Sequence, residues 1–131
     1  QLKQYIEQTQ NDLFADRQLR LMIENGNRQV VGIVDLCSFD PLHNRAEVGI
    51  MVDKSCRRQG IGRNALALLE EHCFRYLGIH QLFAYIAVEN LPSRRLFAAC
   101  GYKESAVLKE WAHTFGGGYT DVLVVQKLNL S

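Results

Sequence analysis

A short basic loop that contains two glycines, RRQGIGR at residues 57–63, is the clearest candidate for a binding site in the sequence. Gly60 and Gly62 would let an anionic ligand approach the backbone closely. A helical pattern begins at Gly60, so unpaired N–H groups and the positive end of the helix dipole would face the same ligand. Positive side chains add to this field: Arg57, Arg58 and Arg63. The stretch therefore favours a pyrophosphate-binding site over a glycine-rich turn with solvated arginines.

A dinucleotide is one ligand that this loop would suit. Residues 60–65 satisfy the pattern G-x-G-x-x-A, and Glu89 lies near the end of the next predicted strand, where a ribose-binding acid would sit. However, seven residues separate Val52, which ends the preceding strand, from Gly60, whereas a nucleotide-binding turn leaves its strand at once. A small dinucleotide-binding module is therefore the minor alternative, and an acyl-coenzyme A is the other candidate ligand.

Hydrophobic periodicity predicts the elements that would position this loop. Residues 1 to about 9 have the pattern of a helix, and Asn25-Gly26 is typical of a type I′ hairpin turn, in which both central residues have positive φ. Residues 81–88 are apolar on both faces, which is typical of a central parallel strand. The remaining predicted elements are two strands around the hairpin, a strand at 46–52, helices at 60–77 and 90–100, and strands at 103–111 and 119–128. This order predicts an α+β domain with one βαβ crossover at its centre.

Composition narrows the classes of function. With 131 residues the chain is expected to form one domain, and a net charge of +1 predicts neither a nucleic acid nor a membrane surface as partner. No apolar run approaches the roughly 20 residues of a membrane span. The cysteines show no C-x-x-C spacing, which favours reduced thiols in a cytoplasmic protein: Cys37, Cys56, Cys73 and Cys100. No histidine pair has metal-ligand spacing, so no metal is expected.

Two sequence blocks, taken together, resemble a known family. Residues 57–62, Arg57-Arg58-Gln59-Gly60-Ile61-Gly62, match Q/R-x-x-G-x-G/A at a helix start, and residues 89–102, ENLPSRRLFAACGY, place an asparagine before a helix that ends in G-Y. In these blocks the chain resembles the GNAT superfamily of acetyl-CoA-dependent N-acetyltransferases. Residues 32–52 and 109–128 are similar to the branch that contains spermidine and ribosomal-protein N-terminal acetyltransferases, with the polyamine enzymes nearer.

The resemblance implies a GNAT-like acyl-CoA N-acyltransferase fold over residues 1–131. This is a three-layer α/β/α arrangement with a mixed, mostly antiparallel, twisted sheet and one central parallel βαβ unit. The family's first strand and most of its first helix would precede Gln1. The edge of the sheet near residues 17–24 would then be unprotected and available for pairing with another chain, which leaves a homo-oligomer open.

The resemblance also implies a reaction, in which an amine attacks acetyl-CoA directly through a tetrahedral intermediate. The acceptor would be a polyamine such as spermidine or a protein N-terminus. The fourth and fifth strands of the family separate, and the pantetheine arm would pair with the backbone of Ile50, Met51 and Val52. The N–H of Met51 or Val52 is the expected oxyanion donor. The other residues implied in cofactor binding are Arg57, Arg58, Gln59, Gly60, Ile61, Gly62, Arg63, Asn90, Ser93, Arg94 and Phe97.

Glu47 is the candidate general base. A primary amine has a pKa near 10.4 and must lose a proton before it attacks. Glu47 lies early in an apolar stretch, where desolvation is expected to raise a carboxylate pKa toward a useful value, and similar enzymes often place a glutamate here. A solvated Glu47 that pairs with a neighbour such as Arg45 is an equally weighted alternative.

Phe97 departs from the family pattern. Many relatives carry at this position a tyrosine that gives a proton to the departing thiolate, and phenylalanine has no hydroxyl. Water, Tyr102 or the substrate ammonium would have to supply that proton, and a thiol pKa near 8.5 already makes the thiolate a fair leaving group. The same substitution supports a second hypothesis, a non-catalytic acyl-CoA-binding or sensor domain.

Overall fold

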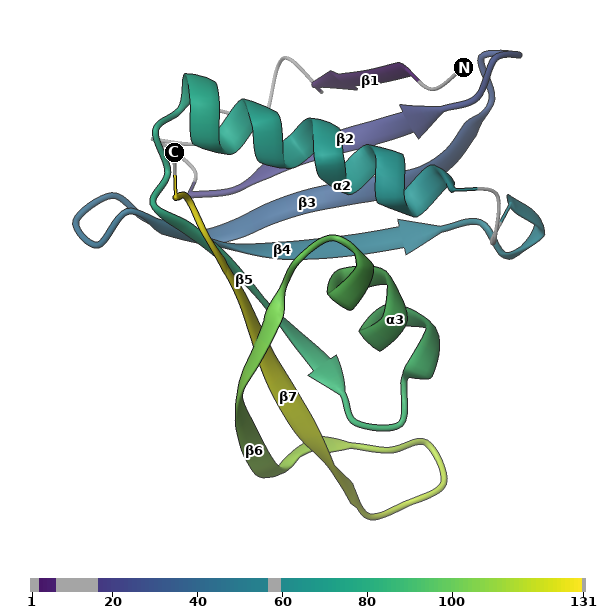
Figure 1. The fold of residues 1–131 in the computed structure, drawn as a ribbon. Coiled ribbons are helices and arrows are strands. Elements are labelled where there is room, and N and C mark those ends of the chain that lie inside the picture. Colours follow the sequence, from purple (N-terminus) through teal and green to yellow (C-terminus); the bar gives the residue numbers. More distant parts are fainter. Residues whose placement is uncertain (1–2, 7–16, 57–59, 131) are drawn as a thin grey trace.

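The computed structural model describes residues 3–6, 17–56 and 60–130. These residues form one seven-stranded sheet in the order β1-β2-β3-β4-β5-β7-β6 (Figure 1). The strands are β1 (Lys3–Ile6), β2 (Leu19–Glu24), β3 (Val30–Asp40), β4 (Arg45–Val52), β5 (Gln81–Ala87), β6 (Lys103–His113) and β7 (Tyr119–Leu128). The helices are η1 (Lys54–Cys56), α2 (Ile61–Glu71), its π-helical continuation η2 (His72–Tyr76) and α3 (Leu91–Ala99). Neighbouring strands are antiparallel except for β4 and β5, which are parallel.

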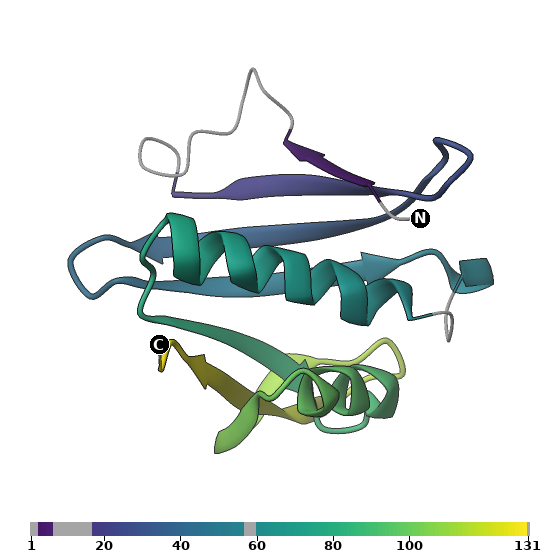
Figure 2. The same ribbon diagram turned by 45° about the horizontal axis from the view of Figure 1, so that its top comes forward.

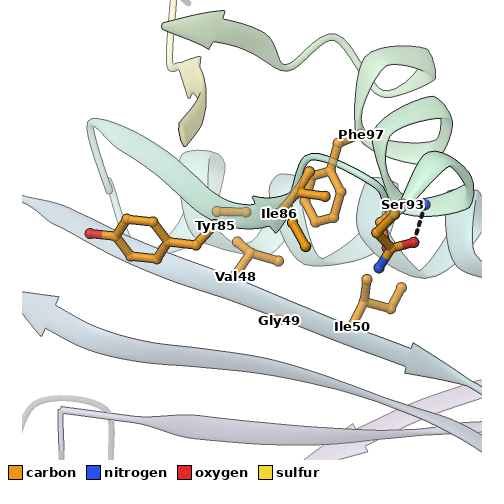
Figure 3. A pocket seen from close by; sticks show the side chains of 10 residues that line it. Val48, Gly49, Ile50, Tyr85, Ile86, Ser93 and Phe97 are labelled. Carbon is orange, nitrogen blue, oxygen red and sulfur yellow. Dashed lines mark hydrogen bonds between the residues drawn. The ribbon is translucent and has the colours of Figure 1, made fainter. Parts of the chain in front are cut away.

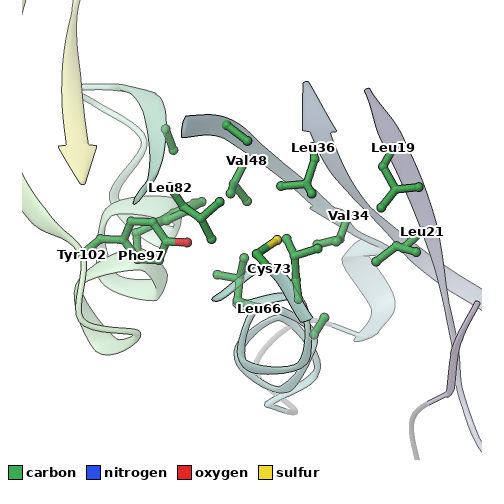
Figure 4. Close-up of a cluster of buried hydrophobic side chains, with 14 of the residues drawn as sticks. Leu19, Leu21, Val34, Leu36, Val48, Leu66, Cys73, Leu82, Phe97 and Tyr102 are labelled. Atoms are coloured by element: carbon green, nitrogen blue, oxygen red, sulfur yellow. The ribbon is translucent and has the colours of Figure 1, made fainter. Parts of the chain in front are cut away.

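Helix α2 forms because its apolar residues recur every three to four positions, which gives it one buried face. That face packs on the sheet, with Leu66 and Cys73 fully buried against side chains of β2, β3 and β4 such as Val34 (Figure 4). Helix α3 lies beside α2 on the same face of the sheet (Figure 2), and contributes Phe97 to the same core. The described helices therefore leave the opposite face of the sheet uncovered by helix.

The predicted helices at 60–77 and 90–100, the strands that follow them and the central parallel crossover are confirmed. A second crossover joins β5 to β6 through α3, because both strands are antiparallel to β7, which lies between them. Of the two helical layers expected, the described residues contain the one formed by α2 and α3. No helix in the described ranges is both long enough and apolar enough to cross a bilayer.

Two expectations at the beginning of the chain are wrong. Residues 3–6 form strand β1 and not a helix, and β1 pairs antiparallel with residues 21–24 of β2, so it covers that part of the edge that was expected to be open near residues 17–24. The hairpin after β2 exists, but its turn is not type I′. Arg28 and not Gly26 has positive φ (61°), and the Asn25 side chain accepts N–H groups of Asn27 and Gln29. The asparagine side chain here organises a longer loop than the Asn-Gly pair alone predicted.

Candidate active site

A gap opens in the middle of the sheet between the parallel strands β4 and β5. Their pairing is limited to three residue pairs, the last of which is Glu47 with Phe83. Beyond this point β4 remains paired with β3 as far as Val52, and β5 remains paired with β7 as far as Ala87. Each strand follows its own neighbour, so the two halves of the sheet diverge (Figure 1).

A cavity of about 210 Å³ occupies this gap (Figure 3). Strand β4, strand β5 and the beginning of α3 all contribute to its wall. The lining residues are Val48, Gly49, Ile50, Ala84, Tyr85, Ile86, Ala87, Asn90, Ser93 and Phe97. Of the predicted site residues, Ile50, Asn90, Ser93 and Phe97 are brought together here. Residues of β5 were not predicted from the sequence to line the site. The apolar strand after the glycine loop is the sequence signal that could have indicated them.

The direction of the backbone groups of β4 follows from its pairing with β3. Asp53 donates its N–H to a β3 carbonyl (2.7 Å), and the Met51 carbonyl oxygen lies 2.6 Å from the position that a Cβ on Gly32 would occupy. Met51 and Asp53 therefore direct their backbone groups toward β3. Because alternate residues of an antiparallel pair bond to each other, the backbone groups of Ile50 and Val52 face the other way, toward the gap.

This alternation decides between the candidate oxyanion donors. Of the two predicted donors, Met51 directs its N–H toward β3, which disfavours it, whereas Val52 faces the gap but does not line the cavity. The physical reason is that a strand residue directs its N–H and its C=O to the same neighbouring strand. Ile50 directs its N–H into the gap at the cavity wall, and no described strand pairs with β4 on that side beyond Glu47.

The beginning of α2 is the second part of the site. Gly60 has φ +77°, a conformation that favours glycine, and leads directly into Ile61. No side chain of the described residues caps this helix end, so within the described part of the chain its first N–H groups have no side-chain acceptor. Arg63 is exposed in the first turn. The predicted contacts at Arg57, Arg58 and Gln59 lie outside the described residues.

Gly62 has a packing role that the sequence did not indicate. A Cβ at this position would lie 3.2 Å from Leu96 Cδ2 and 3.7 Å from Ile50 Cδ1. A Cβ here would crowd the Leu96 side chain of α3, whereas its distance from Ile50 of β4 is that of an ordinary contact. The glycine therefore allows the beginning of α2 to approach α3 closely.

Asn90 begins α3 as predicted, because its Oδ1 accepts the Ser93 N–H (3.3 Å). The amide group of Asn90 and the Ser93 side chain both belong to the cavity wall. Arg94 differs from the prediction of a cofactor contact. Its guanidinium donates to the Val88 carbonyl (2.9 Å) and lies 3.4 Å from Glu104, so it connects α3 to the end of β5 and to β6.

Glu47 lies at the point where β4 and β5 separate, on the face of the sheet opposite the helices. Its Oε1 accepts the Ser38 hydroxyl (3.4 Å), and no ion pair involves it within the described residues. Arg45, the alternative partner, instead lies 3.6 Å from Asp40. Cys37 is the cross-strand neighbour of Glu47, and burial and then the negative charge of Glu47 raise the pKa of its thiol. Glu47 is thus a half-buried carboxylate next to a neutral thiol.

Phe97 is 3% exposed at the cavity wall, and its ring packs edge-on against that of Tyr102, with centroids 4.9 Å apart. Tyr102 is also buried and does not line the cavity. Burial and then the charge of Glu70 raise the pKa of Tyr102, so its hydroxyl keeps its proton. Tyr102 therefore does not replace the missing tyrosine hydroxyl at the cavity.

Comparisons with known proteins agree with this geometry. Residues 1–103 match the family described as Acetyltransferase (GNAT) domain. A spermidine N(1)-acetyltransferase of Vibrio cholerae is 27% identical over 103 residues, which are 79% of this chain and 59% of that protein. An N-acetyltransferase 9-like protein of Nematostella vectensis is 35% identical over 96 residues, which are 66% of this chain and 48% of that protein. The chain thus spans 59% and 48% of the length of these two curated relatives.

A solved structure shares the fold. The dodecameric structure of spermidine N-acetyltransferase from Vibrio cholerae superposes with a TM-score of 0.82 at 25% identity, and covers 89% of this chain and 68% of that chain. The strand order, the separated central strands and the family match all disagree with the dinucleotide-binding alternative. In addition, helix α2 is separated from β4 by η1 and does not follow the strand directly.

Proposed function

The chain belongs to the GNAT acetyltransferase family, and from this premise we propose that it transfers an acetyl group from acetyl-CoA to a primary amine. The observation that carries the proposal is the gap between β4 and β5, where backbone groups of β4 are directed at a cavity instead of at a strand. An extended ligand with amide groups can pair with such an edge as an added strand does. The beginning of α2, which no side chain of the described residues caps, suits the negative phosphates of the same ligand.

Acetyl-CoA, when bound, supplies a thioester carbonyl that the amine nitrogen attacks and a thiolate that leaves; the nitrogen, once bonded to the acetyl carbon, gives up a second proton, which the thiolate takes directly or through a water. The N–H of Ile50 would hold the carbonyl oxygen as negative charge develops on it. Glu47 would accept a proton from the incoming ammonium, directly or through a water. Asn90 and Ser93 would bind the pantetheine arm at the cavity wall, and Gly60, Ile61, Gly62 and Arg63 would bind the pyrophosphate together with Arg57, Arg58 and Gln59.

We propose that the amine enters from the face of the sheet that the described helices leave open. Glu47 is on this face, and Asp35 lies on the neighbouring strand, 2.9 Å from Arg20. Phe83 and Tyr85 present aromatic rings on the same face, 5.7 Å apart between centroids, and Tyr85 is 45% exposed. Because Asp35 is already paired with Arg20, the Glu47 carboxylate beside these rings is the group that would attract a cation, and a polyamine such as spermidine carries several positive charges where a protein N-terminus carries one, which favours the polyamine.

The release of free thiol from acetyl-CoA tests the reaction. Spermidine as acceptor is expected to release thiol faster than a peptide that begins with alanine. Faster thiol release with the peptide than with spermidine would instead indicate a protein N-terminus as the acceptor. Tight binding of acetyl-CoA without thiol release from either acceptor would favour the acyl-CoA sensor, which the hydroxyl-free ring of Phe97 at the cavity wall supports as the second candidate function.

Filling the cavity is expected to prevent cofactor binding. Ser93→Trp places a large ring in a cavity of about 210 Å³, and should weaken acetyl-CoA binding at least about ten-fold, since a ligand that cannot seat its arm loses most of its buried contacts. Calorimetric titration with acetyl-CoA measures the change. Arg95→Trp is the matched control, because Arg95 is exposed on the same helix and does not line the cavity. Equal affinities in both variants would contradict this position for the cofactor.

We further propose a cytoplasmic homo-oligomer in which residues 1–131 form one acetyltransferase domain. The Vibrio cholerae relative is described as dodecameric. Strand β6 is an outer strand of the sheet and almost wholly exposed, and the hairpin it forms with β7 carries exposed aromatic rings at Trp111, Phe115 and Tyr119. The free thiols of the described residues support a reducing compartment.

A further inference from the structure

An ion pair between a buried carboxylate and a lysine that is 30% exposed connects the two helices through β7, outside the cavity. Glu70 of α2 is 7% exposed, and its Oε1 lies 2.6 Å from the Nζ of Lys127 on β7. The same Nζ donates to the carbonyl of Cys100 at 2.6 Å. Cys100 ends α3, so one ammonium group bonds to a side chain of α2 and to the C-terminal backbone of α3. A cation also interacts favourably with the negative end of a helix dipole at such a position.

This arrangement is not explained by stability alone. A carboxylate is almost never buried unless it is paired, and apolar side chains of the same size often hold a core at least as well as a buried ion pair. The pair adds geometric specificity. Two short charge-assisted bonds from one ammonium group restrict how Glu70, Lys127 and the Cys100 carbonyl can be arranged. Nearby, Glu70 Oε2 and the Tyr102 hydroxyl are buried without a hydrogen-bond partner in the described part of the chain. The group of Glu70, Tyr102, Lys127 and the Cys100 carbonyl thus contains more polar atoms than packing of the core requires.

Two contacts, one near each end of α2, show what this arrangement of charges holds in place. Near its beginning, α2 meets α3 at Gly62, where a Cβ would lie 3.2 Å from Leu96. Further along, Lys127 connects α2 to the end of α3. The two contacts lie near the two ends of α2 and both in the second half of α3, so they hold α2 along its length against the end of α3 and limit the angle between the two helices. The beginning of α2 and the Asn90 end of α3 are the two helix ends proposed to bind the cofactor.

We infer that Lys127 is a positioning residue for acetyl-CoA, which it never touches, and that it acts by fixing the angle between α2 and α3. This inference rests on the proposed function, because it assumes that both helix beginnings contact one ligand. If the angle relaxes, the pyrophosphate site and the pantetheine site no longer match the length of a single cofactor. Binding of acetyl-CoA should then weaken, while the amine site on the open face of the sheet is unaffected.

The test uses a double variant, Glu70→Gln with Lys127→Met, because Lys127→Met alone would leave a buried carboxylate unpaired and risk unfolding. The double variant keeps the side-chain volumes and removes both charges. We expect a rise of about ten-fold in the KM for acetyl-CoA and in its Kd by calorimetry, with kcat and the KM for the amine changed less than about two-fold, since small displacements of bound groups weaken such a fit. Lys127→Arg alone keeps the positive charge next to Glu70, and this variant should retain most of the parent's affinity for acetyl-CoA.

The control is Glu71→Gln with Arg75→Met, an exposed ion pair one residue along the same helix, with a distance of 3.7 Å. It should leave both KM values unchanged. The inference is overturned if the Glu70/Lys127 double variant binds acetyl-CoA as the parent does, whatever its Tm, or if both KM values rise together. Failure of the proposed function is recognised separately, since the parent protein would then release no thiol or bind no acetyl-CoA.

Discussion

Glu47→Gln is expected to reduce kcat by about 10²–10⁴, the range that a positioned general base contributes. The glutamine retains the size of the side chain and the contact with Ser38, but it cannot accept a proton from the ammonium. Glu47 does not line the cavity, so the affinity for acetyl-CoA should remain that of the parent protein. Thiol release at saturating amine, together with calorimetric titration of acetyl-CoA, measures both quantities.

The control for this prediction is Glu24→Gln, which changes a half-buried strand carboxylate at the far end of β2. It should leave kcat within about two-fold of the parent value, since substitutions away from the site have small effects. A Glu47→Gln protein that turns over as fast as this control would exclude Glu47 as the base. A bound water or the bulk solvent would then have to accept the proton.

Ile50→Pro should reduce kcat by about 10²–10³, the usual effect of losing one oxyanion donor. Proline has no backbone N–H, and the amide of Ile50 faces the gap, so the hydrogen bonds between β4 and β3 are retained. The preceding residue, Gly49, has no Cβ to clash with the proline ring. Steady-state kinetics with acetyl-CoA and spermidine would measure the loss.

Ile50→Ala is the matched control, because it shortens the side chain and leaves the N–H in place. Its kcat should exceed that of Ile50→Pro by at least about ten-fold, even if its Tm falls with the lost packing. Met51→Pro provides the opposite case. It removes an amide that bonds to β3, and should lower the Tm. Equal kcat values for the proline and alanine variants at position 50 would show that another donor stabilises the oxyanion.

The sequence alone predicted the elements with strong periodicity, since a single buried face determines their residue pattern. Helix α2, helix α3 and the apolar strand β5 are of this kind. Strand β1 was predicted as a helix because four residues are too few to distinguish a period of two from one of 3.6. Its pairing with β2 is a tertiary contact that local pattern does not encode.

The site was predicted unevenly for similar physical reasons. The glycine loop and Asn90 have local signals, namely a helix start and a helix cap, and these are visible in sequence. The hydrogen-bonding register between β4 and β3 determines which amide of β4 faces the gap. The pattern of side chains in the sequence does not indicate that register. The partners of Arg94 depend on where β6 lies, which only the fold decides.

The junction at Glu47 and Phe83 also divides the molecule mechanically. Among the described residues, three pairs connect β1–β4 with β5–β7 across the sheet, whereas β3 with β4 and β5 with β7 each form seven. Proteins open locally in cooperative units of this kind. Strands β5–β7 can therefore exchange their amide hydrogens with solvent while strands β1–β4 stay closed. A ligand that hydrogen-bonds to both β4 and β5 across the gap would connect the two halves of the sheet, so that β1–β4 and β5–β7 would open and close together.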